Sequence, residues 1–178
     1  MFRFDPNVYM SLAAVVIGTV AAFIDIKYRK IPNWLTFPAM LSGIAINLIL
    51  NFKNWHFPLL GLIVGYLILI IPFLLGGIGA GDVKLLMALG AFLGMRKIIV
   101  VGLYGGIAGG LLSLFVLLHQ IGTMNVEFKL FSLVTSIWDK EMRGKMLTPG
   151  QRSKLTVPYG LAIYIGLLAG LLWGPFWG

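Results

Sequence analysis

Long apolar runs separated by short polar segments constrain this chain more than any other feature of its sequence. Of the 178 residues, 59% are hydrophobic and only 11% are charged, and the mean hydropathy is +0.94. In soluble domains roughly a quarter of the residues are charged. A soluble domain of this length could not bury so much apolar surface away from water. We therefore expect lipid to be the main solvent of an all-α, polytopic membrane protein, because helices satisfy their own backbone hydrogen bonds in lipid.

The apolar runs predict six transmembrane helices within a single domain over residues 1–178. They cover residues 8–26, 34–50, 57–75, 83–94, 98–119 and 157–173. The fourth run spans only about 18 Å as a helix, against a hydrocarbon core of about 30 Å, so its helix is expected to begin upstream, near Gly77. The first run is not expected to be a cleaved signal peptide, because its basic cluster follows the apolar residues.

The basic residues predict the orientation of these helices. Ten of the 14 Lys and Arg residues fall on the side that holds the loops after the first, third and fifth runs. Basic residues are retained in the cytoplasm. We therefore expect the loops after the first, third and fifth runs to be cytoplasmic and both termini to lie outside. Segment 120–156 is the most basic, and its residues 125–139 fit a cytoplasmic amphipathic helix on the membrane surface, with anionic lipids as partners.

Other residue types exclude several classes of site. The chain has no cysteine, and its two histidines lie far apart in the sequence, so we expect no disulfide, no metal centre and no cofactor. The formal charge of +8 is explained by basic residues retained in cytoplasmic loops. No nucleic-acid partner is expected.

Two of the six acidic residues, Asp25 and Asp82, lie against apolar runs. An ionisable group at membrane depth is costly, which makes each a functional-site hypothesis. Two spans separate them, so both are predicted at the cytoplasmic side. Two carboxyl groups brought close together share one proton; the ionised one can take a proton from water while the other donates one. This chemistry hydrolyses a peptide bond without a metal or a covalent intermediate.

The residues around Asp82 allow two interpretations. Gly79 and Gly81 have no Cβ, so an extended substrate backbone can approach Asp82 closely. Asp82 also opens a helix, where capping is the alternative role. Asp25 is near a helix C-terminus, where the helix dipole disfavours a negative charge, and no capping role is expected for it. Lys84 is two positions from Asp82 and is not expected to pair with it.

Three motifs resemble those of the type IV prepilin peptidases. Gly79-Ala80-Gly81-Asp82 resembles the GxGD signature of membrane aspartyl proteases. Asp25 followed by Ile31-Pro32-Asn33, and Val157-Pro158-Tyr159-Gly160 before the last run, resemble further family features. The resemblance covers essentially the whole chain. It is closest to the short forms that serve Tad/Flp-type pili, with archaeal preflagellin peptidases as more distant relatives.

The resemblance implies an aspartic endopeptidase of the bacterial inner membrane. Such an enzyme cuts the short basic leader of a prepilin or pseudopilin precursor at the cytoplasmic face. It implies Asp25 and Asp82 as the catalytic pair, with supporting roles for Asn33, Lys84 and Tyr159. The large bifunctional members carry an added cytoplasmic segment with cysteines and also N-methylate the new terminus. This chain has neither feature, so we expect no N-methyltransferase activity and no S-adenosylmethionine cofactor.

Two other classes of function remain open. A proton- or cation-coupled transporter would also use the Asp25 and Asp82 carboxylates, but such groups usually lie near the membrane midplane between broken helices. Here both map to one interface, which favours the peptidase. A scaffold subunit of a secretion or pilus machine would need neither aspartate. The oligomeric state is left open.

Overall fold

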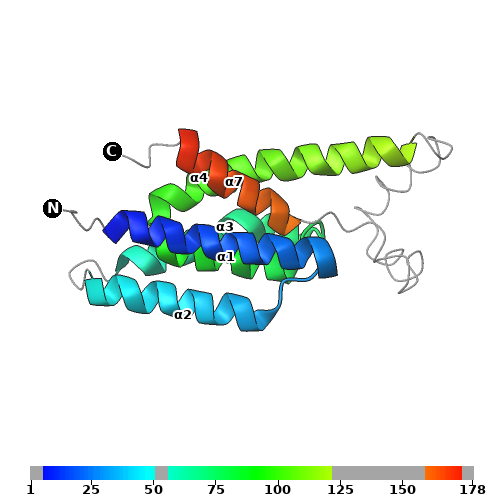
Figure 1. Ribbon diagram of the computed structural model, residues 1–178. Coiled ribbons are helices and arrows are strands. Elements are labelled where there is room, and N and C mark those ends of the chain that lie inside the picture. The colour runs from blue at the N-terminus through cyan, green and yellow to red at the C-terminus, as the bar shows by residue number, and fades with distance from the viewer. Residues whose placement is uncertain (1–5, 51–55, 122–158, 174–178) are drawn as a thin grey trace. The chain divides into compact units, whose positions relative to one another are not determined.

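The computed structural model describes residues 6–50, 56–121 and 159–173, and the regular elements in these ranges are all helical (Figure 1). This confirms the all-α prediction. The helices are α1 (Pro6–Tyr28), α2 (Asn33–Leu50), α3 (His56–Leu74), α4 (Ala80–Ile121) and α7 (Tyr159–Trp173).

The chain divides into two compact units. The first contains residues 1–109 and 158–178, and the second contains residues 110–157. Of the second unit the structure describes only the helical stretch 110–121. The prediction of one domain over residues 1–178 stays a prediction, and the predicted amphipathic helix over 125–139 lies outside the described residues. Both aspartates belong to the first unit.

Four of the described helices, α1 to α4, are long and apolar enough to cross a membrane, and α7 is a shorter apolar helix. Helix α4 is interrupted at Gly94, whose φ of 76° and ψ of 175° are not helical. This break is where the sequence predicts the boundary between the fourth and fifth runs. The count of six spans stays a prediction, which requires both parts of α4 and the short α7 to cross the bilayer.

The start of α4 differs from the prediction: α4 begins at Ala80 and not near Gly77. The reason is the way that α3 ends. Gly76 adopts a φ of 76°, its N–H donates to the carbonyl of Phe73, and the N–H of Gly77 donates to the carbonyl of Pro72, both at 2.9 Å. This is the Schellman pattern that terminates helices with a left-handed glycine. The glycine stretch is therefore a turn that stops one helix before the next begins.

Close glycine contacts hold the helices of the first unit together. Where α3 and α4 cross, the Cβ position of Gly61 faces the backbone carbonyl of Gly90, and that of Gly90 faces the carbonyl of Gly61. Gly65 meets the backbone of Leu86 at 2.6 Å from its Cβ position. Small residues allow such approach of helices in lipid. Gly61, Gly65 and Gly90 therefore serve the packing of α3 against α4.

Other helices surround the first part of α4. Asn47 of α2 donates from Nδ2 to the carbonyl of Ala91 at 2.9 Å. Helices α1 and α7 lie side by side (Figure 1), with Gly18 of α1 against Tyr164 and Leu167 of α7. Helix α7 in turn sets Gly166 against the backbone of α4 at Gly105. The largest fully buried side chains include three in the first part of α4, Leu85, Leu86 and Leu89.

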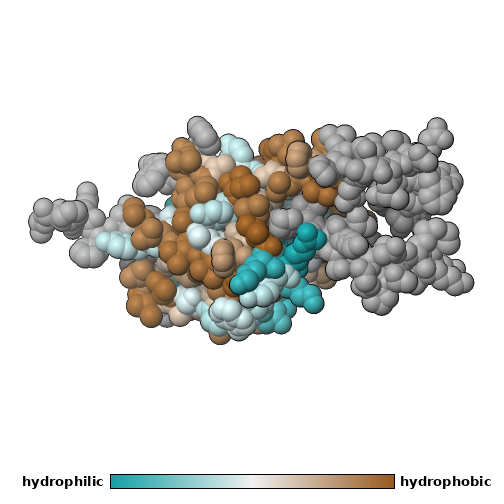
Figure 2. All heavy atoms as spheres, turned by 45° about the vertical axis from the view of Figure 1, so that its right-hand side comes forward, coloured by the Kyte–Doolittle hydropathy of each residue, from teal (hydrophilic) through white to brown (hydrophobic). Residues whose placement is uncertain are grey.

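The outer faces of these helices are apolar. Ile49 is 81% exposed and Leu172 is 72% exposed, and Figure 2 shows hydrophobic residues over much of the described surface, with hydrophilic ones gathered in one patch. Exposed apolar faces of this extent suit lipid contact, as expected for membrane helices.

Substituting Gly61 by Ala is expected to lower the free energy of unfolding by about 1–3 kcal/mol, because the new methyl group meets backbone that cannot rotate away. Gly106 is the matched control, since no described atom lies within 4 Å of its Cβ position. Gly106→Ala is expected to be neutral or to stabilise by up to about 1 kcal/mol. Unfolding of the purified protein in mixed detergent micelles measures both changes in the free energy of unfolding. Equal changes in the two variants would contradict the close crossing of α3 and α4 at Gly61.

Candidate active site

Asp25 lies in the last turn of α1 and is held by the first turn of α7. The residue is 5% exposed. Its Oδ2 accepts a hydrogen bond from the backbone N–H of Gly160 at 2.8 Å, and the N–H of Leu161 interacts with the same carboxylate. The first N–H groups of a helix have no partner within it and carry its positive dipole end. The expectation that Asp25 has no capping role is therefore wrong, because Asp25 caps a neighbouring helix.

The end of α1 fixes the backbone of Asp25. Arg29 takes a left-handed conformation with a φ of 52°, and its N–H donates to the carbonyl of Asp25 at 2.7 Å. This is a one-bond helix stop, of a kind usually made by glycine. The chain then turns through Ile31 and Pro32, and the carbonyl of Pro32 accepts the first hydrogen bonds of α2.

Asp82 is the third residue of α4. The carbonyl of Gly79 accepts hydrogen bonds from the N–H groups of Asp82 and Val83, at 3.2 and 3.4 Å. In return, Oδ2 of Asp82 accepts from the N–H of Gly79 at 3.1 Å. This is the side-chain half of a capping box, so the capping interpretation of Asp82 is confirmed for one of its two oxygens.

The second oxygen of Asp82 is different. Oδ1 is buried and has no hydrogen-bond partner among the residues that the structure describes. Burying a polar atom without a partner costs free energy, and such atoms are rare outside functional sites. Oδ1 is therefore the oxygen of this carboxyl group that takes no part in capping the helix.

The two carboxyl groups lie at the same end of the first unit, where α1 ends and where α4 and α7 begin. They are close enough to interact electrostatically. Ile31 connects their supports: its Cδ1 is 3.0 Å from the Cβ position of Gly160, and its carbonyl oxygen is 3.0 Å from that of Gly81. One residue of the α1–α2 loop thus packs against both backbone segments that carry the acids.

The predicted supporting residues are placed around this pair. Lys84 donates from Nζ to Oδ1 of Asn33 at 2.9 Å, and its Nζ lies 5.0 Å from the centre of the Phe37 ring. Lys84 therefore joins the start of α4 to the start of α2. Tyr159, the first residue of α7, interacts electrostatically with Asp82, and its ring packs against Gly109.

The two glycines near Asp82 have different surroundings. The Cβ position of Gly81 is filled by Ile31, whose Cβ is 3.0 Å away, so this glycine allows close packing of the chain on itself. Within 4 Å of the Cβ position of Gly79 the described residues place only Oδ2 of Asp82 and the amide of Gly81. Gly79 is the better candidate for close approach of a substrate backbone.

Sequence reasoning missed Gly160 and Ile31. A Cβ at Gly160 would lie 2.9 Å from Oδ2 of Asp25, so only glycine lets the α7 backbone approach this carboxylate. The signal was available, since Gly160 belongs to a motif that opens the last run. Among the described residues there is no cluster of three His, Cys, Asp or Glu side chains that could hold a metal ion.

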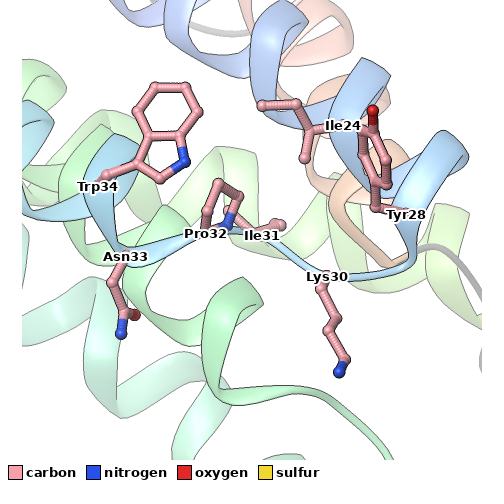
Figure 3. Close-up of a pocket in the computed structure, with 7 residues that line it drawn as sticks. All are labelled: Ile24, Tyr28, Lys30, Ile31, Pro32, Asn33 and Trp34. Atoms are coloured by element: carbon pink, nitrogen blue, oxygen red, sulfur yellow. The ribbon is translucent and has the colours of Figure 1, made fainter.

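A groove of about 520 Å³ lies at the junction of α1 and α2 (Figure 3). We call it the α1–α2 groove. Trp34 stands on one side of it, and Ile24 and Tyr28 stand on the other (Figure 3). The remaining lining residues are Lys30, Ile31, Pro32 and Asn33.

The sequence matches the type IV leader peptidase family over residues 12–114. The chain belongs to this family. The matched range contains both aspartates and the glycine turn before α4. No solved structure matches the chain.

Among the relatives, the prepilin leader peptidase/N-methyltransferase of Aeromonas hydrophila is 33% identical over 118 residues, which are 61% of this chain and 41% of the relative. The protein of the same name from Burkholderia pseudomallei is 38% identical over 98 residues, 51% of this chain and 32% of the relative. That of Bacillus subtilis is 30% identical over 110 residues. The chain thus spans about a third to two-fifths of the length of these curated relatives.

Asp25→Ala is expected to destabilise the protein by about 1 kcal/mol, because the first N–H groups of α7 lose their acceptor. Asp25→Asn keeps an acceptor oxygen and is expected to cost a few tenths of a kcal/mol at most. Unfolding in mixed micelles measures both, and hydrogen exchange at Gly160 locates the effect. Equal stability of the two variants, with unchanged exchange at Gly160, would show that Asp25 does not cap α7.

Proposed function

We propose that this protein is a membrane aspartic endopeptidase that removes the short basic leader of type IV prepilins, of the Tad/Flp type or related pseudopilins. The observation that carries the proposal is the pair of acids held at one end of the helix bundle, one of them with a buried oxygen that lacks a partner. Membership of the type IV leader peptidase family supports the same activity.

The hydrogen bonds suggest how the pair divides the chemistry. Asp25 accepts backbone N–H bonds at the positive end of α7, which favour its ionised form, so we assign it as the general base. Asp82 carries the shared proton on Oδ1. Asp25 takes a proton from water as the water oxygen attacks the peptide carbonyl carbon, and Asp82 gives its proton to the carbonyl oxygen.

Collapse of the resulting tetrahedral intermediate completes the cut. The C–N bond breaks, Asp25 passes its proton to the leaving nitrogen, and the hydroxyl formed on the carbonyl oxygen returns its proton to Asp82. Both carboxyl groups regain their initial states, as a catalyst requires. Gly79 is the position at which the substrate backbone comes close to Asp82.

The position of the acids supports this function over a transporter. Asp25 is the fourth residue from the end of α1 and Asp82 is the third residue of α4, so neither lies at mid-helix. Carboxylates that bind transported ions usually lie near the midplane. We propose leader cleavage alone, without methyl transfer, as the activity of this chain.

The distribution of basic residues supports an active site at the cytoplasmic face, with both termini outside. Since the chain has no cysteine, single cysteines can report the topology. Lys27→Cys is expected to react with a membrane-impermeant maleimide only after the membrane is opened, whereas Lys53→Cys reacts in intact cells or spheroplasts. The opposite pattern would overturn the orientation.

Asp25→Asn and Asp82→Asn are each expected to lower leader cleavage by about 10²–10⁴-fold, the usual contribution of general acid–base catalysis. The assay is co-expression with candidate prepilins, followed by mass spectrometry of the new amino terminus, which is expected to be unmethylated. Asp5→Asn is the control, since Asp5 precedes the first apolar run. Cleavage by both variants at the normal rate, with normal membrane insertion, would eliminate the proposal.

A further inference from the structure

The α1–α2 groove is an apolar hollow with little polar chemistry of its own. Five of its seven lining residues are apolar or aromatic: Ile24, Tyr28, Ile31, Pro32 and Trp34. The side chains of Lys30 and Asn33 point to the other side of the loop from Trp34 and Ile24 (Figure 3). The amide oxygen of Asn33 is already occupied by Lys84. The groove therefore offers an apolar surface, with polar groups only at its edge.

One lining residue of the groove, Ile31, also packs against the backbone segments that hold the two acids. Ile31 lines the groove, is itself 8% exposed, and packs against both Gly160 and Gly81. Gly160 binds the Asp25 carboxylate, and Gly81 precedes Asp82. A single residue thus lies between the groove and the backbone segments that hold the catalytic pair.

The size of the groove sets what can fill it. Pockets that bind small ligands usually measure about 300–1,000 Å³, and this one, at about 520 Å³, has room for more than one side chain. Trp34 is 67% exposed and Tyr28 is 62% exposed, so two aromatic rings stand at its border without being buried by the protein itself. Burying the apolar surface of these rings against an apolar group of a bound molecule is favourable.

We infer that the α1–α2 groove is a substrate subsite, which takes the apolar side chains that follow the cleaved bond. This inference rests on the proposed function. Trp34 and Ile24 are then specificity-determining residues, because they form the opposite walls of the subsite (Figure 3).

The charges around the groove give the direction in which the substrate lies. Lys27, Arg29 and Lys30 are exposed on the same turn, and their positive charge repels the basic residues of a leader. The leader therefore lies away from this loop, and the apolar part of the precursor lies over it. The groove thus selects the side chains on the mature side of the bond.

The test compares Trp34→Ala with Phe23→Ala on two precursors, one with a large apolar residue after the cleaved bond and one with Ala there. The two aromatic residues are matched in exposure, at 67% and 66%, but only Trp34 lines the groove. Trp34→Ala is expected to lower kcat/KM for the large residue by about 10- to 200-fold, mainly through KM, and to change the Ala precursor little. Phe23→Ala is expected to leave both precursors unchanged.

A filling variant gives the complementary result. Ile24→Trp narrows the groove and is expected to lower kcat/KM for the large-residue precursor more than kcat/KM for the Ala precursor. This pattern excludes misfolding, because a misfolded enzyme loses both substrates. An equal loss of kcat/KM for both precursors in Trp34→Ala would overturn the subsite. If added lipid also changes the size of this loss, the groove holds a lipid chain.

Failure of the subsite and failure of the proposed function give different results. If the unaltered protein cuts a precursor and Asp82→Asn abolishes this cleavage, the proposed function is supported, regardless of the results for the groove variants. If neither groove variant then changes the preference between the precursors, only the subsite is overturned. If the unaltered protein cuts no precursor, binding of fluorescent precursor peptides still tests the groove: weaker binding of the large-residue peptide by Trp34→Ala alone supports it, and equal binding overturns it.

Discussion

Two carboxyl groups held by the backbone N–H groups at helix starts are the interaction on which the rest of this structure depends. Asp25 binds the first turn of α7, and Asp82 binds the residue that precedes its own helix. An apolar helix bundle offers few groups that can stabilise a carboxylate, and the positive end of a helix is one of them. The same contacts that stabilise the acids in an apolar bundle also fix their positions, as the proposed catalytic pair requires.

The glycines make this arrangement possible by bringing backbones together. Gly160 allows α7 to approach Asp25, and Gly81 allows the start of α4 to pack on Ile31. At a distance from the acids, Gly61 and Gly90 let α3 and α4 cross in contact. The positions of the two acids and the crossing of α3 and α4 thus depend on where side chains are absent. The end of the bundle that holds the two acids is assembled from three separate helix ends and one loop.

Sequence reasoning predicted the helices and the two acids because both leave a local signal. Apolar runs predict spans to within a few residues, as for α2, and an acidic residue against such a run stands out. Three features were missed, and two of them depend on partners distant in the sequence. Asp25 caps α7, 135 residues away, which no local pattern shows. The start of α4 was placed too early because span length outweighed the left-handed turn at Gly76. The packing of Ile31 between Gly81 and Gly160 appears only in three dimensions.

The most direct test of the central claim is the binding of a precursor peptide whose cleaved bond is replaced by a hydroxyethylene group, a mimic of the tetrahedral intermediate. If both carboxyl groups act on one reacting carbon, this analogue binds the unaltered protein at least about 10²-fold more tightly than the ordinary peptide. Asp25→Asn and Asp82→Asn then each lose that advantage while still binding the ordinary peptide. An advantage that survives in either variant would contradict the account.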